Sequence, residues 1–370
     1  WDKTGTDAWW DGVVRMNEIG WGKAIAGLIS SKKRKETWDS IFVPIRQPDW
    51  WQGDSEYHAP KYSEPVSELE RRLKAGEFVV TSEVAPPLST ATGKLKRDID
   101  MLKPYVTSIN FTDAASAMPK MSSFGCSVVA LEQGAEPVLQ IAARDVTRIG
   151  LQGQVLSASA LGIRNILVIT GDSARLGEKP LSRTDLVDLD SVQMLWILRR
   201  MRDEGIYLGG RPIKNPPKIF IGAAASPFAS EPHFQALREH KKVNAGAQFF
   251  QTNLVFDVNG LETWLNALAK RNILDKVYIL VGITPLKSYK MAKYLDEEVP
   301  GVKVPQSILK RLEAAGEQGA PEEGFNIAME LIQAIRKLQG VNGIHLMPVY
   351  WEDIVPRIVQ EAGLQKAVVN

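Results

Sequence analysis

The sequence predicts an α/β fold, a (β/α)8 TIM barrel preceded by a Trp-rich N-terminal extension. From residue 78 onward, short apolar runs typical of buried strands alternate with helix-like segments. Strict alternation implies parallel strands with right-handed crossovers, which leaves a closed barrel or a doubly wound sheet. Roughly eight units fit a (β/α)8 barrel, and no Gly-x-Gly-x-x-Gly follows the first strand. We therefore favour the barrel.

The first 77 residues are expected to form the extension, and residues 78–370 the barrel domain. Seven of the ten tryptophans lie in the extension, interleaved with the basic run Ser31-Lys-Lys-Arg-Lys-Glu36. Such a mixture is compatible with nucleic-acid stacking or a membrane-surface helix, but tryptophans in an irregular arm more often pack against another surface. We interpret it as a docking arm, in which prolines make 42–66 an extended connector and 68–74 forms a helix ending at Gly76.

The barrel elements follow in order. The expected strands are residues 78–83, 106–111, 138–142, 166–170, 218–223, 248–252, 277–282 and 344–348. The expected helices are residues 93–102, 122–133, 146–161, 190–202, 232–243, 260–270, 288–295 and 322–338. Two of these helices precede the last strand, and only a short tail over 354–362 follows it.

Composition argues against several classes of protein. The formal net charge of +2 gives no sign of a nucleic-acid or membrane partner. The single Cys126 excludes a disulfide framework and a cysteine-based zinc site, and it fits a cytoplasmic location. No apolar run reaches the roughly 18 residues of a membrane span. The four histidines lack metal-ligand spacing, so we expect no metal.

In a barrel, side chains at the carboxyl ends of the strands face the active site. Glu83 ends the first strand beside Val84 and Ala85, and partial burial there would favour the neutral acid, a proton donor. The alternative is a cap or salt-bridge partner. Asp172 follows Gly171 after the fourth strand, where it could orient a substrate amide or amino-pyrimidine or place charge beside a cofactor. Its alternative role is a helix N-cap.

Basic residues occupy two further positions. Arg144-Asp145 follows the third strand and could hold a phosphate and a hydroxyl, because a guanidinium offers two parallel donors. An ion pair within the loop is the alternative. Lys242 ends the helix before the sixth strand, where it either complements the helix C-terminus or reaches a phosphate.

Several stretches resemble methylenetetrahydrofolate reductase, in the family's order, across roughly residues 78–364. They are Glu83 to Pro87, Asn110-Phe-Thr-Asp113, Leu139-Gln-Ile-Ala-Ala-Arg-Asp145, Leu161-Gly-Ile-Arg-Asn-Ile-Leu-Val-Ile-Thr-Gly-Asp172 and Ala245-Gly-Ala-Gln-Phe-Phe-Gln-Thr-Asn253. The Arg-Asp and Thr-Gly-Asp pairs resemble the branch found in anaerobic and acetogenic one-carbon metabolism. The resemblance implies a (β/α)8 barrel with a flavin, FAD or else FMN, over its C-terminal rim.

The implied reaction moves a hydride from reduced flavin N5 to 5,10-methylenetetrahydrofolate and gives 5-methyltetrahydrofolate. Glu83 matches the family's general acid, and Asp172 matches a carboxylate near the pterin and the flavin. The residues implied to contact flavin are Thr112, Arg144, Asp145, Thr170, Gly171 and Lys242, and those implied to contact folate are Gln251, Asn253 and Tyr289. Asn253 stands where the family commonly has a Gln, and Gln251 is the residue placed to compensate.

Other functions stay open from the sequence. One is a pterin-dependent methyl-transfer protein without flavin, and another is a non-catalytic barrel subunit that docks a partner through the N-terminal arm. The expected electron donor is NAD(P)H, ferredoxin or a redox partner subunit. A homo-oligomer and a hetero-oligomer are equally open.

Overall fold

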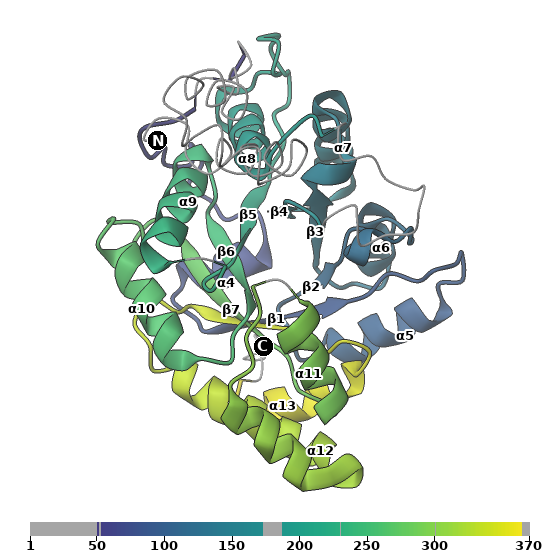
Figure 1. The fold of residues 1–370 in the computed structure, drawn as a ribbon. Coiled ribbons are helices and arrows are strands. Elements are labelled where there is room, and N and C mark those ends of the chain that lie inside the picture. Colours follow the sequence, from purple (N-terminus) through teal and green to yellow (C-terminus); the bar gives the residue numbers. More distant parts are fainter. Residues whose placement is uncertain (1–49, 52, 173–186, 230, 300, 365–370) are drawn as a thin grey trace, which may run out of the picture. The chain divides into compact units, whose positions relative to one another are not determined.

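The computed structural model describes residues 50–51, 53–172, 187–229, 231–299 and 301–364. Eight parallel strands close a barrel in sequence order, and β1 pairs with β8. The helices lie outside the strands (Figure 1). The predicted barrel is confirmed, and the doubly wound alternative is wrong because the sheet closes on itself.

The barrel lies within the second of two units into which the chain divides, Trp1–Gln52 and Gly53–Asn370. Most of the predicted docking arm, residues 1–49 and residue 52, lies outside the described residues. Its docking role stays a prediction.

Each expected strand overlaps an observed one. The strands are β1 (Val79–Val84), β2 (Ser108–Phe111), β3 (Pro137–Ala142), β4 (Asn165–Ile169), β5 (Phe220–Ala225), β6 (Phe249–Leu254), β7 (Tyr278–Ile283) and β8 (Gly343–Leu346). The α-helices in the described residues are α4 (Glu68–Lys74), α5 (Gly93–Leu102), α6 (Ser123–Glu132), α7 (Arg148–Leu161), α8 (Ser191–Arg199), α9 (Pro232–Ala245), α10 (Val258–Ala269), α11 (Tyr289–Glu298), α12 (Gln306–Ile335) and α13 (Val355–Glu361).

Helix α12 departs most from the predicted elements, because only 322–338 was expected to be helical. It begins at Gln306 and leaves helical geometry at Gly316, where φ is +65°, before Pro321. A glycine and a proline five residues apart indicate a helix boundary. The sequence pattern therefore did not predict the part of α12 before Pro321. Gly324 is required for packing, since a Cβ there would lie 1.8 Å from the Leu286 carbonyl oxygen.

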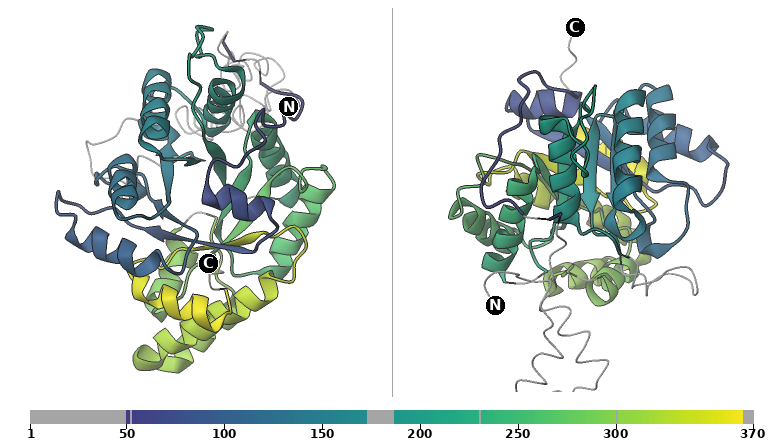
Figure 2. Two further views of the ribbon diagram at one scale, coloured as in Figure 1. Left: turned by 180° about the vertical axis from the view of Figure 1, so that it is seen from behind. Right: turned by 90° about the horizontal axis from the view of Figure 1, so that it is seen from above.

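An apolar plug closes the amino-terminal end of the barrel. The plug consists of Leu69 and Leu73 of α4 with Val79, Val138, Leu167, Phe220, Phe249 and Leu280 from the strands. The Phe220 and Phe249 rings stack with centroids 4.8 Å apart. Gly222 makes room for them, because a Cβ there would lie 2.2 Å from the Phe249 ring. Helix α4 therefore packs as a lid over this end of the barrel (Figure 2).

The N-terminus of α4 is tied to the barrel by a buried carboxylate. Glu136, just before β3, accepts the backbone N–H groups of Glu68 and Leu69 at 2.7 and 2.9 Å. It also accepts the Asn165 amide Nδ2 at 2.9 Å. Burial raises the pKa of Glu136, and these donors act in the opposite direction. The contacts hold a carboxylate where the helix dipole favours negative charge.

The plug can be tested by truncating its central side chain. Leu69→Ala is expected to lower the free energy of unfolding by about 2–5 kcal/mol, because Leu69 is 0% exposed and its loss leaves a cavity. Urea unfolding followed by circular dichroism measures the change. The matched control is Ile149→Ala in α7, since Ile149 is 80% exposed and its change should stay within about 0.5 kcal/mol. Equal losses in the two variants would contradict a structural role for α4.

Candidate active site

A cavity of about 350 Å³ opens at the carboxyl ends of the strands. Of the predicted site residues, those that line it are Glu83, Thr112, Thr170, Gly171, Asp172, Lys242, Gln251 and Asn253. In the described part of the chain, Arg144, Asp145 and Tyr289 are not among its lining residues. The strand register thus brings together residues from distant parts of the sequence, as expected for parallel strands.

Glu83 lies at the side of this cavity with its side chain 23% exposed. The Gln140 amide Nε2 donates to Glu83 Oε2 at 3.1 Å, and His345 Nε2 lies 3.8 Å from the same oxygen. Val84 is buried on the opposite face of the strand, because successive side chains alternate. The carboxylate is therefore partly buried as predicted, but the residues that contact it are polar rather than the apolar neighbours expected.

His345 is the residue of this network that sequence reasoning missed. It is 2% exposed, and its Nδ1 lies 2.9 Å from Thr81 Oγ1. From the sequence, the histidines were weighed only as metal ligands, and His345 has no second histidine at a suitable spacing for that role. The available signal was strand alternation, which puts His345 of β8 on the same face as Met347, a cavity residue just after the strand.

Gln251 belongs to the buried layer beneath the cavity. Its Nε2 donates to Thr81 Oγ1 and to Asn110 Oδ1, both at 3.0 Å, and its Oε1 accepts the Asn110 amide. Both amide hydrogens are thus engaged inside the barrel. A folate contact by Gln251 stays a prediction, and it would have to use the remaining lone pair of Oε1.

Asn253 lies two residues further along β6, at the cavity wall. Its Oδ1 accepts the backbone N–H of Leu254 at 2.9 Å, next to a register irregularity between β6 and β7. Within the part of the chain that the structure describes, the Nδ2 group is then the part of Asn253 left to donate to a bound molecule.

Asp172 and its neighbours form the wall of the cavity at the end of β4. The Asp172 side chain is exposed, and its Oδ2 accepts the Ser116 backbone N–H at 2.6 Å. Residues 173–186, which would decide the N-cap alternative, lie outside the described residues. Helix α8 begins at Ser191, and Asp190 caps it.

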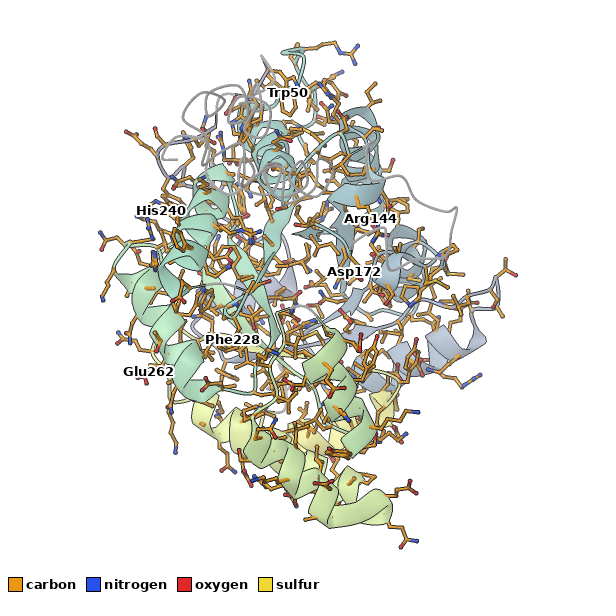
Figure 3. All side chains as sticks on the ribbon, viewed as in Figure 1. Trp50, Arg144, Asp172, Phe228, His240 and Glu262 are labelled. Atoms are coloured by element: carbon orange, nitrogen blue, oxygen red, sulfur yellow. The ribbon has the colours of Figure 1, made fainter. Side chains whose placement is uncertain are left out.

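Arg144 makes the ion pair that was the alternative to a phosphate contact. Its Nε donates to Asp145 Oδ1 at 2.9 Å, and its Nη2 pairs with the other Asp145 oxygen. The bond to the Asp145 carboxylate raises the pKa of Arg144. The Arg144 side chain lies near Asp172 (Figure 3), to whose backbone carbonyl its Nη1 donates at 2.7 Å.

Cationic groups line the cavity near β5. Lys242 Nζ donates to the Ala224 carbonyl at 2.6 Å and lies 2.9 Å from Glu239 Oε2. Arg238 also lines the cavity, and sequence reasoning missed it although it lies one helical turn before Lys242. Among the described residues, the buried Thr112 hydroxyl has no hydrogen-bond partner. A bound polar molecule would supply one.

Comparison with known proteins decides the family. Residues 68–363 match the sequence model of methylenetetrahydrofolate reductase. The chain belongs to this family. Methylenetetrahydrofolate reductase 1 of Schizosaccharomyces pombe is 24% identical over 295 residues, which are 75% of this chain and 45% of that protein. The chain thus spans about half the length of this relative.

A solved structure shares the fold of this methylenetetrahydrofolate reductase family member. It is an uncharacterized Clostridium thermocellum protein that binds two copies of 5-methyl-5,6,7,8-tetrahydrofolic acid. The TM-score is 0.55 at 16% identity, covering 80% of this chain and 97% of that one. The resemblance inferred from the sequence is confirmed at the level of family and fold.

Among the helices of the described residues, none is long and apolar enough to cross a membrane. In the same residues, no group of three or more His, Cys, Asp or Glu side chains is arranged to hold a metal ion.

The buried amide layer can be tested through stability. Gln251→Leu is expected to lower the free energy of unfolding by about 1–3 kcal/mol, because the Asn110 amide and the Thr81 hydroxyl lose a partner in the barrel interior. Thermal unfolding measures the loss. Thr170→Val is the control, since it changes an exposed hydroxyl that also lines the cavity. If Gln251→Leu were as stable as this control, the layer would not stabilise the barrel.

Proposed function

We propose that the chain is a flavin-dependent reductase that converts 5,10-methylenetetrahydrofolate to 5-methyltetrahydrofolate. Membership of the methylenetetrahydrofolate reductase family over residues 68–363 supports this class of reaction. The observation that carries the mechanism is the Glu83 carboxylate, which lines the cavity, accepts a hydrogen bond from Gln140 and lies 3.8 Å from His345 Nε2. NAD(P)H or a redox partner subunit stays the predicted electron donor.

The residues around the cavity fit a flavin cofactor, FAD or FMN. The unpartnered Thr112 hydroxyl, considered among the described residues, offers a hydrogen bond to a polar ring atom. Arg238 and Lys242 offer positive charge for a phosphate on the β5 side. When bound, the flavin would supply the hydride that reaches the one-carbon unit of folate.

Glu83 is assigned the proton transfer. The bridging ring of the substrate opens when folate N10 is protonated, so the acid must carry a proton when the substrate binds. Gln140 donates to Glu83 Oε2, which leaves Oε1 as the oxygen that can hold the transferable proton. His345 Nε2 lies 3.8 Å from Oε2, and the contact of its Nδ1 with Thr81 Oγ1 orients the ring, so the polar surroundings of Oε2 are in place before folate enters.

Asp172 is assigned an electrostatic role. Ring opening leaves a cationic iminium on the substrate, and a fixed carboxylate nearby stabilises that charge. The Ser116 N–H occupies Asp172 Oδ2, so, as judged from the contacts of the described residues, Oδ1 is the oxygen that would face the pterin.

Replacing the acid tests the proton transfer. Glu83→Gln is expected to bind flavin and accept electrons normally but to reduce folate at least about 100-fold more slowly, because an amide cannot donate the proton. Anaerobic stopped-flow absorbance measures the two half-reactions separately. Ser82→Ala is the matched control, since the Ser82 hydroxyl bonds the Leu346 carbonyl at 3.3 Å on the adjacent strand. Normal folate turnover by Glu83→Gln would rule out this mechanism, and a purified protein that binds no flavin would rule out the cofactor.

Neutralising Asp172 tests the electrostatic role. Asp172→Asn is expected to slow the folate half-reaction by about tenfold or more and to make the flavin potential more positive, because a negative charge is lost beside both ligands. Spectroelectrochemistry measures the potential. Asp100→Asn serves as the control, because its side chain is 51% exposed and pairs with Lys103. If neither the rate nor the potential changed, Asp172 would have no electrostatic role.

A further inference from the structure

Arg144 lies behind the cavity wall, where it joins the loops that follow β2, β3 and β4. Its side chain is 8% exposed. Besides its pairing with Asp145, Nη1 donates to the Asp172 carbonyl at 2.7 Å and Nη2 to the Ala114 carbonyl at 3.1 Å. Arg144 and Asp172 follow β3 and β4, and their labels lie next to each other in Figure 3.

The loop after β2 has an unfavourable backbone conformation that needs such support. Ala114, Ser116 and Ala117 have φ values of 44°, 60° and 53°. This left-handed region disfavours residues other than glycine, so the surrounding contacts must hold the loop in place. Asp113 anchors the start of the loop, since its Oδ2 accepts the Ala142 N–H at 3.0 Å.

The contacts form a closed circuit. Arg144 holds Ala114, the same loop presents the Ser116 N–H to the Asp172 carboxylate, and the Asp172 carbonyl returns to Arg144. Gly171 allows the circuit to close. Its φ is +86°, and a Cβ there would lie 3.2 Å from the Arg144 Cβ.

The hydrogen-bond donors of Arg144 are almost fully used by this circuit. A guanidinium has five N–H donors. The bonds to Asp145, Ala114 and Asp172 account for Nε, both Nη2 hydrogens and one Nη1 hydrogen, as far as the described residues show. A bidentate phosphate contact would therefore require Arg144 to release the loops.

We propose that Arg144 is a positioning residue that clasps the loop after β2 to the end of β4 and thereby fixes the direction of the Asp172 carboxylate, instead of gripping a cofactor phosphate. The effect on catalysis rests on the proposed reductase function. The clasp itself is a property of the protein without ligands.

The first experiment measures the clasp without any ligand. Amide hydrogen exchange of peptides covering residues 112–118 is compared in the full-length wild type, Arg144→Gln and Arg148→Gln. Arg148, the first residue of α7, is the matched control, because it forms its ion pair with Asp188. Exchange is expected to be about tenfold faster at Ser116 in Arg144→Gln and unchanged in Arg148→Gln. Unchanged exchange in Arg144→Gln would overturn the proposal, whether or not the protein proves to be a reductase.

The second experiment separates positioning from cofactor binding. Arg144→Gln is expected to change the dissociation constant of FAD by less than about threefold. It is expected to slow the folate half-reaction about tenfold, because the Asp172 carboxylate is no longer held in one direction. In an Asp172→Asn background the same change should have little further effect, because both act through one carboxylate. A loss of FAD affinity of tenfold or more in both backgrounds would instead assign Arg144 to the cofactor.

A second substitution covers the case in which Arg144→Gln fails to fold. Arg144→Lys keeps the charge but cannot bond Asp145, Ala114 and Asp172 together, because an ammonium lacks the planar fork. It should reproduce both the faster exchange and the slower folate half-reaction. Wild-type behaviour of Arg144→Lys in both measurements would overturn the clasp.

Discussion

Closure of the parallel barrel is the constraint on which the rest of the structure depends. It forces every second side chain of each strand into one interior, so those side chains must fill it in layers. The layer at the amino-terminal end is apolar and includes the Phe220 and Phe249 stack. The next layer is polar, with Gln251 bonded to Asn110 and Thr81. The cavity lies above it.

The polar layer links the fold to the proposed chemistry. Buried amides and hydroxyls stabilise a structure only when their hydrogen bonds are made, and then they hold their neighbours in one arrangement. Thr81 bonds both Gln251 and the His345 ring, and His345 in turn approaches Glu83. An acid supported in this way does not have to be ordered by the substrate.

The wall around Asp172 is built on a different principle, in loops rather than strands. Its parts follow β2, β3 and β4, and side chain to backbone bonds hold them together. A strained loop such as the one containing Ser116 persists when its surroundings over-determine it. The two proposed catalytic carboxylates thus depend on separate supports, one inside the barrel and one between the loops.

The sequence by itself determined the barrel, its strands and the family, because strand periodicity and the order of motifs are local properties of the chain. It also identified most of the residues that line the cavity, since parallel strands bring their carboxyl ends to one face. Only the tertiary structure decided how those side chains are used. Three features depend on partners between 28 and 264 residues away in the sequence. They are the hydrogen bonds of the Gln251 amide, the placement of His345 beside Glu83, and the direction of the Arg144 side chain. Local patterns carry no information on such partners, because closure of the barrel and packing of the loops bring them together.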